Sequence, residues 1–192
     1  MTYGFQRTAT GRVTLRVDQV ERGLLMSVAR QVMDLVQPAE ASRDQDPLAA
    51  QLGWVEGDVG ISDDPAVARL LPDAYDDPDD AREYRRFTEN DLRQSKMQHA
   101  MTVVEEIERS GEKVAVTSTD SWLGLLNDAR IAIGTRIQIS EDNHEELAGL
   151  PDDDPRSGLF HVYDWLTFLQ ELSLIHISEP TRRRGISYAV FC

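Results

Sequence analysis

The stretch WLGLLNDARIAIGTRI, residues 122–137, constrains the fold more than any other part of the sequence. On a helix that turns by about 100° per residue, its apolar side chains form one continuous arc. The members of this arc are Trp122, Leu125, Leu126, Ala129, Ala132, Ile133 and Ile137. Arg130 and Arg136 lie at its edges, and an unpaired buried charge is costly. The stretch therefore predicts a central helix beside polar partners for two guanidinium groups.

The first part of the chain predicts a small sheet followed by helices. Residues 3–17 alternate around Thr10-Gly11, which is typical of a β-hairpin. Asp18 is a good N-cap for a helix that reaches about residue 37, before a proline. Residues 38–64 are irregular, with a possible short helix over 47–52 and the character of a mobile loop or lid. A short helix is expected over 65–71, where Asp64 precedes Pro65 at the helix start.

The second part of the chain predicts further helices around one strand. A helix begins near Pro78 and either runs to Arg109 or restarts at Thr88. Residues 113–118 form a strand that could join the hairpin, and Thr119 or Asp120 caps the central helix. An acidic helix over about 140–149 and a last helix from about Gly158 complete the chain. The predicted fold is mainly α (α+β): a helical domain with a small N-terminal β-hairpin, extended at most by one further strand.

The last residues do not read like the rest of the chain. The run LSLIHISEPTR, which begins at Leu172, resembles the translation of a sequencing-library adapter, and the closing ISYAVFC resembles the end of the same adapter. The acidic, helix-patterned sequence also stops after Glu171. We therefore expect residues 1–171 to be a single domain and residues 172–192 to be a non-native, adapter-derived tail.

The charge of the chain argues against direct binding to DNA. The formal net charge is −14, and the expected tail contributes one glutamate and three arginines, so residues 1–171 carry 33 acids and 17 bases, a net charge of −16. Such a charge repels phosphate, so we expect no direct nucleic-acid partner. The only cysteine, Cys192, lies in the expected tail. With no secretory signal and no apolar run of membrane-spanning length, we expect a cytoplasmic protein without a membrane partner.

The helix around RRFTENDLRQSK, residues 85–96, has charged residues on its inward face. Glu89, Arg93 and Lys96 share the arc that apolar residues occupy further along the helix, and Glu89 and Arg93 can pair at i,i+4. We infer that this charged half faces Arg130 and Asn127. Structural pairing, a partner or ligand surface, and catalysis all remain open. The residues predicted to form this polar network or to bind a partner are Arg85, Arg86, Glu89, Asn90, Arg93, Lys96, Asn127, Asp128, Arg130 and Arg136.

The sequence offers no pattern typical of a catalytic or metal site. The acidic runs at 76–80 and 152–154 adjoin prolines at expected helix starts, where carboxylates cap backbone amides rather than bind metal. No serine nucleophile elbow, phosphate-binding glycine loop or Cys-His pair is present. We therefore expect no catalytic residues, no metal and no cofactor, and a protein that is not an enzyme.

Five runs of the sequence resemble one family. They are RLLPDAY (69–75), EYRRFTENDLRQSK (83–96), WLGLLNDARIAIGTRI (122–137), LPDDDPR (150–156) and YDWLTFLQE (163–171). In this order they resemble an actinobacterial domain-of-unknown-function family, some of whose members are oxidative-stress transcriptional regulators (AosR-like). The resemblance implies a protein-interaction module that acts on transcription through a sigma factor or RNA polymerase, rather than by catalysis.

The resemblance also leaves alternatives and shows one departure. Genes of the family often lie beside the ClpS adaptor, which implies a link to Clp proteolysis as an alternative. A further alternative is a small-molecule-binding protein or enzyme that uses the polar cluster of residues 85–96 and 127–130. Regulation in the family is linked to a cysteine-based redox switch, whereas residues 1–171 contain no cysteine. A disulfide switch within that part of the chain is therefore excluded.

Overall fold

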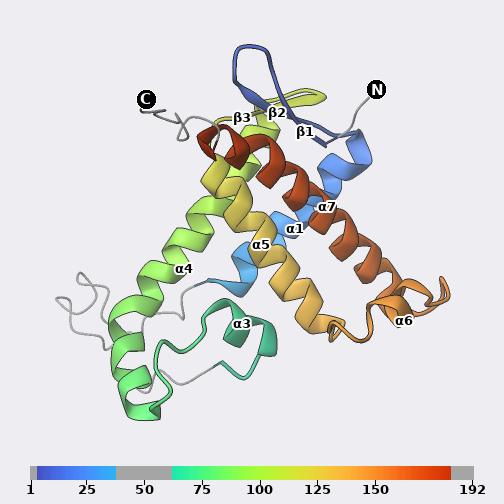
Figure 1. Ribbon diagram of the computed structural model, residues 1–192. Coiled ribbons are helices and arrows are strands. Elements are labelled where there is room, and N and C mark those ends of the chain that lie inside the picture. Colours follow the sequence, from blue (N-terminus) through green and yellow to red (C-terminus); the bar gives the residue numbers. More distant parts are fainter. Residues whose placement is uncertain (1–3, 38–61, 183–192) are drawn as a thin grey trace, which may run out of the picture.

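A bundle of helices carries a small antiparallel sheet at one end (Figure 1). The computed structural model describes residues 4–37 and 62–182, with side chains as far as Ser173. The protein is mainly helical with a three-stranded sheet, so the predicted α+β class is confirmed. The helix predicted over 47–52, and most of the loop or lid around it, lie outside the described residues.

The sheet consists of β1 (Gly4–Arg7), β2 (Val13–Arg16) and β3 (Lys113–Val116), in that order across the sheet. Phe5 pairs with Leu15, and Leu15 pairs with Val114, so a row of buried side chains crosses all three strands. The turn between β1 and β2 contains Gly11 at φ +83, a conformation that glycine adopts without strain. The predicted hairpin and its extension by a third strand are both confirmed.

Three helices begin at the acidic caps predicted for them. Asp18 forms a capping box with Glu21 at the start of α1 (Gln19–Leu35). Asp64 accepts a hydrogen bond from the amide of Ala66 in α3 (Pro65–Leu70). Asp77 accepts hydrogen bonds from two amides in the first turn of α4 (Pro78–Glu108). Helix α4 runs without a break past residue 88, so the uninterrupted alternative is the correct one.

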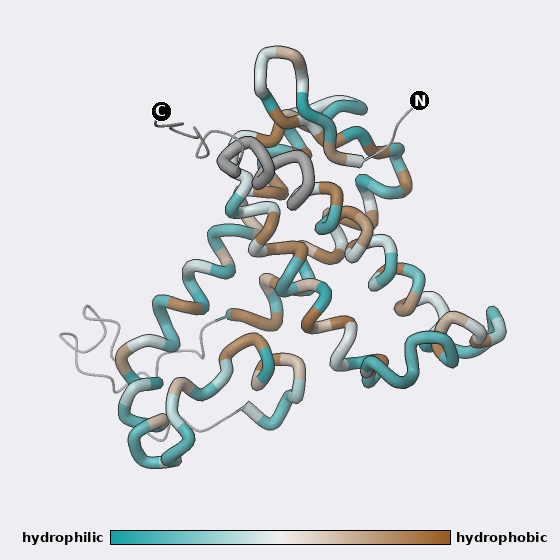
Figure 2. The backbone as a smooth tube through the Cα atoms, in the orientation of Figure 1, coloured by the Kyte–Doolittle hydropathy of each residue, from teal (hydrophilic) through white to brown (hydrophobic). Residues whose placement is uncertain are grey.

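The predicted central helix is α5 (Thr119–Arg136), which packs against α1, α3, α4 and α7. Trp122 is fully buried, and its ring meets Phe5 of β1 edge to face at a centroid distance of 5.6 Å. This contact joins the helical core to the sheet. Figure 2 shows apolar residues gathered where the helices cross, below the sheet. The organising role predicted for residues 122–137 is confirmed.

The start of α5 differs from the prediction. Its N-cap is Ser118, whose side chain makes no capping hydrogen bond, and neither Thr119 nor Asp120 takes that role. Glu106 of α4 instead accepts hydrogen bonds from the amides of Thr117 and Ser118, from the Thr117 hydroxyl, and from the Trp122 indole. A buried carboxylate from a neighbouring helix therefore stabilises the positive end of α5.

The last two helices also have other bounds than predicted. Helix α6 is short (His144–Ala148), and α7 (Pro155–Arg182) begins three residues earlier than expected. Helix α7 continues beyond Glu171, where Leu172 packs against the core and Ser173 is buried. Helix α7 therefore extends into the expected tail, and the single domain of residues 1–171 and the adapter origin of residues 172–192 stay predictions. Across the two described ranges, no helix combines the length and apolar character needed to cross a membrane.

Candidate functional site

The predicted charged half of α4 forms an ion-pair network that holds the α3–α4 loop in place. Arg85 donates to Asp73 and to the Leu71 carbonyl in the loop, and to Glu89 one turn along the helix. Glu89 also accepts from Arg93, at 2.7–2.8 Å. Burial opposes the charge of Arg85, but the hydrogen bonds that its guanidinium donates to Asp73 and Glu89 outweigh this effect and raise the pKa of the guanidinium. The network therefore fixes the loop to the helix.

Two further predicted residues tie α4 to neighbouring helices. The Lys96 ammonium lies 2.7 Å from Asp128 of α5, whose side chain is only 3% exposed. Arg93 donates to the Gln37 carbonyl, just beyond the end of α1, at 3.0 Å. Removal of Lys96 would leave Asp128 charged and buried, so this pair stabilises the packing of α4 against α5, and the Arg93 contact joins α4 to the end of α1. Structural pairing, one of the open alternatives, therefore describes these residues.

The prediction that the charged half of α4 faces Arg130 is wrong. Arg130 donates instead to side chains of α7, at 2.9 Å to Thr167 and 2.8 Å to Gln170, and its guanidinium lies 5.2 Å from the Tyr163 ring centre. The helical wheel gave the direction of Arg130 correctly as a core edge, but α7 rather than α4 covers that edge.

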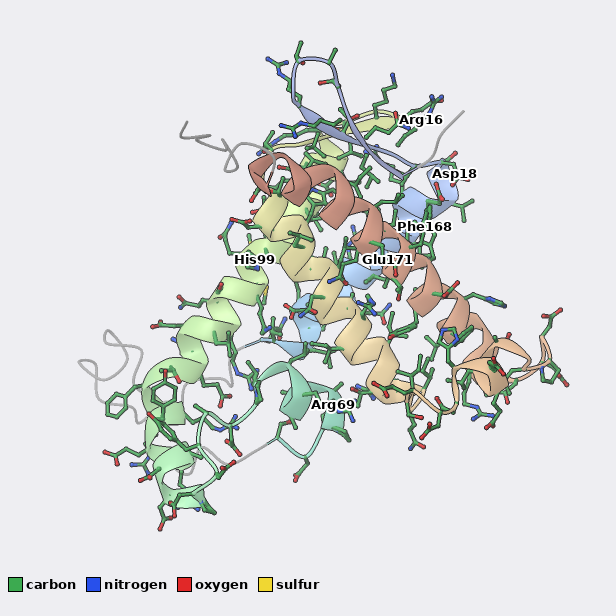
Figure 3. All side chains as sticks on the ribbon, viewed as in Figure 1. Arg16, Asp18, Arg69, His99, Phe168 and Glu171 are labelled. Carbon is green, nitrogen blue, oxygen red and sulfur yellow. The ribbon has the colours of Figure 1, made fainter. Side chains whose placement is uncertain are left out.

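The other predicted residues occupy separate places. Arg136 pairs with Asp64 at the start of α3, at 2.7 Å. Asn127 is exposed and lines a groove of about 340 Å³ with Arg130 and Arg69, the α3 residue labelled in Figure 3. Asn90 is half-buried, and the Arg86 Nε is buried without a hydrogen-bond partner among the described residues. The ten predicted residues therefore do not form one site.

The structure reveals exposed aromatic residues that the sequence analysis did not single out. Tyr75 in the α3–α4 loop and Tyr84 of α4 are 51% and 45% exposed, and their rings meet edge to face at a centroid distance of 5.5 Å. Phe87, one turn further, is 56% exposed. Aromatic side chains are large and apolar, so their exposure at one end of a domain is typical of a contact surface.

Acidic side chains surround this tyrosine pair. Residues 72–91 contain eight acids and three bases, a net charge of −5. They lie at the end of α4 that is remote from the sheet (Figure 1), and Figure 2 shows this end as largely hydrophilic. We call the Tyr75–Tyr84 pair and residues 72–91 around it the acidic tip. Such a surface can bind a cationic or amphipathic partner and repels an anionic one.

In addition to the groove beside Asn127, a hollow lies between α1 and α5. It has a volume of about 460 Å³, and its walls are mainly apolar side chains such as Val28, Val32 and Ile133, with Gln31, Asp34 and Arg136 among the polar residues that line it. No group of three or more metal-ligating side chains occurs in the described part of the chain. The acidic tip thus combines exposed aromatic rings and charge, whereas the hollow offers mostly apolar surface.

Comparison with known proteins places the chain in a family. The model of a domain of unknown function, DUF2017, matches residues 2–177. The chain belongs to this family. Proteins named oxidative stress regulator AosR in Mycobacterium tuberculosis and Mycobacterium bovis are each 29% identical to it, over 79% of this chain and 75% of theirs. No solved structure matches the chain.

The DUF2017 match includes the central helix, the ion-pair network and the acidic tip, since all lie between residues 2 and 177. The resemblance inferred from the five sequence runs is therefore confirmed. The name shared by the mycobacterial relatives describes a regulatory role in oxidative stress. Most of the charged residues predicted for the site of this DUF2017 protein are paired within the fold. The acidic tip is therefore the candidate surface for binding a partner.

Proposed function

We propose that this DUF2017 protein is a cytoplasmic regulator that controls stress-dependent transcription by binding a sigma factor or RNA polymerase. In this proposal it acts through a protein interface, without a catalytic step and without direct contact with DNA. The observation that carries the proposal is its likeness to the AosR regulators over three quarters or more of each chain.

Two features of the molecule support a protein interface. The charged residues of α4 that face inward are held in ion pairs within the fold. The acidic tip instead presents aromatic rings and a net negative charge to the outside. A negative surface disfavours direct binding to DNA and favours a basic region of a partner protein.

The proposal gives the chain no disulfide switch of its own. The sequence contains one cysteine, so two cysteines cannot pair within the chain. In this proposal, a stress signal reaches the complex through the partner or through the amount of the regulator.

An affinity pull-down of the full chain from an actinobacterial lysate, at low and at high salt, tests this proposal. We expect mass spectrometry to identify a sigma factor or RNA polymerase subunits at low salt and to find much less at high salt, because salt screens attraction between exposed charges. Recovery of Clp components without transcription proteins would contradict the proposal and support the link to proteolysis. Recovery of neither group would also contradict it.

A further inference from the structure

We infer that the acidic tip is a docking surface for an arginine-containing basic segment of a partner protein. In the docked state, arginine side chains lie on the rings of Tyr75 and Tyr84 while the surrounding carboxylates pair with the segment's other charges. This inference deepens the proposed function and rests on it only in taking the partner to be a protein.

The geometry of the tyrosine pair leaves ring surface for a cation. In an edge-to-face pair, the ring that contributes its edge keeps both of its faces clear of the other ring. Both tyrosines are about half exposed, so part of each side chain is within reach of a ligand. The guanidinium of arginine is planar, weakly hydrated and stacks on aromatic rings, whereas the ammonium of lysine is a strongly hydrated point charge. The rings therefore favour arginine over lysine.

Unpaired acids beside the rings determine the charge of the partner. Asp76, Asp80 and Glu83 are exposed and make no ion pair with any residue in the described parts of the chain. Their field attracts a positively charged segment and opposes an acidic segment or a nucleic acid. Aromatic faces and free carboxylates within one short stretch together match an arginine-rich peptide segment.

The fold holds this surface in place before any partner binds. Arg85 fixes the loop through Leu71 and Asp73, and Asp77 caps α4 immediately after Tyr75-Asp76. Because the loop is already ordered, docking loses less conformational entropy than it would on a free segment. Arg85 is therefore a positioning residue for Tyr75 and is not itself part of the contact surface.

Fluorescence anisotropy with a short labelled peptide of alternating arginine and glycine tests the inference on the full chain. The double variant Tyr75→Ala/Tyr84→Ala should bind this peptide at least about fourfold more weakly, since one exposed cation–π contact corresponds to roughly two- to fivefold in affinity. Phe168→Ala is the matched control, because Phe168 is 49% exposed on α7, away from the tip. Tyr75→Phe/Tyr84→Phe should keep the affinity, and a lysine–glycine peptide of equal length should bind more weakly than the arginine peptide.

A second pair of variants separates the acidic tip from the overall charge. Asp76→Asn/Asp80→Asn/Glu83→Gln should weaken binding of the arginine peptide several-fold. The control Glu141→Gln/Asp152→Asn/Asp153→Asn changes the net charge equally at exposed positions outside the acidic tip, and should have little effect. Equal losses in the two triple variants would overturn the inference. Unchanged binding by the double alanine variant, with circular dichroism showing an intact fold, would also overturn it.

The same variants distinguish this inference from the proposed function. If Tyr75→Ala/Tyr84→Ala still captures transcription proteins as well as the unaltered chain, the docking surface is wrong and the proposed function stands. If the peptide results are as expected but no transcription protein is captured, the proposed function fails and the docking surface stands.

Discussion

Replacement of Glu106 by glutamine should destabilise the protein far more than the same change at its neighbour Glu105. The Glu106 carboxylate is buried and accepts hydrogen bonds at both oxygens. One oxygen faces the Thr117 hydroxyl and two amides, at 3.0 and 3.1 Å, and the other lies 2.7 Å from the Trp122 indole nitrogen. A glutamine amide has only one oxygen, so its NH₂ group must face donors on one side.

The size of this effect follows from the hydrogen bonds that the glutamine side chain cannot make. If the glutamine oxygen faces the amides at the start of α5, the glutamine NH₂ group faces the Trp122 indole N–H. The charge-assisted hydrogen bond from Trp122 is then lost, and two donors face each other. A hydrogen bond to a charged group contributes about 1.5–3 kcal/mol, and an unsatisfied buried donor costs about 1–3 kcal/mol. Because the two terms overlap, we expect Glu106→Gln to lower the free energy of unfolding by about 2–4 kcal/mol.

Urea unfolding followed by far-UV circular dichroism measures this difference. Glu105→Gln is the control, since Glu105 lies on the same helix but is exposed and pairs with Arg109 on the surface. We expect its effect to stay within about 0.5 kcal/mol. The reasoning is refuted if the two variants unfold at the same urea concentration, because the carboxylate of Glu106 would then contribute no more than a surface acid.

Three further substitutions test other parts of the fold. Lys96→Met should lower the free energy of unfolding by about 3 kcal/mol by leaving Asp128 charged and buried, and Lys96→Met/Asp128→Leu should recover most of this loss in urea unfolding; no recovery would contradict a direct pair. At the α4–α5 contact, where His99 is labelled in Figure 3, a β-carbon at Gly124 would overlap the His99 ring. Gly124→Ala should therefore lower the melting temperature, and adding His99→Ala should restore part of it; an unchanged melting temperature for the single variant would argue against the close approach. Hydrogen bonds from Arg156 lower the pKa of Asp154 in the folded state. The Asp154 carboxylate therefore stabilises the folded state at a pH above its unfolded pKa, and this contribution is lost as the pH falls through its folded pKa. Asp154→Asn should be less stable than the unaltered chain at neutral pH and equally stable in strong acid; a difference that persists in acid would contradict this assignment.

Much of the fold was predictable because its signals are local. Asp18 with Glu21 and Asp64 with Pro65 each lie within one helical turn of the start that they mark, and the backbone requires such caps wherever a helix begins. The Thr10-Gly11 turn fixed the hairpin in the same way. The start of α5 was missed because its cap, Glu106, comes from another helix. Its position on the same face as Val103 and Ile107 was a usable signal that this acid is buried.

The candidate site was only partly predictable, because a helical wheel gives a direction and not a neighbour. Glu89 and Arg93 pair as predicted, since residues at i,i+4 lie side by side on any helix. The partner of Arg130 depends on which helix covers that edge of α5, and the sequence does not contain this information locally. Tyr75 and Tyr84 belong to a loop and a helix, so their contact follows from the way Arg85 holds the loop.

The most direct test of the account is photo-crosslinking in living actinobacterial cells. A benzoylphenylalanine introduced at Tyr84 would report which protein touches the acidic tip, and the same group at Phe168 would serve as the control. The account predicts a crosslink from position 84 to an arginine-containing segment of a sigma factor or of RNA polymerase, absent from position 168. Adducts that contain no transcription protein, or that are the same from both positions, would contradict it.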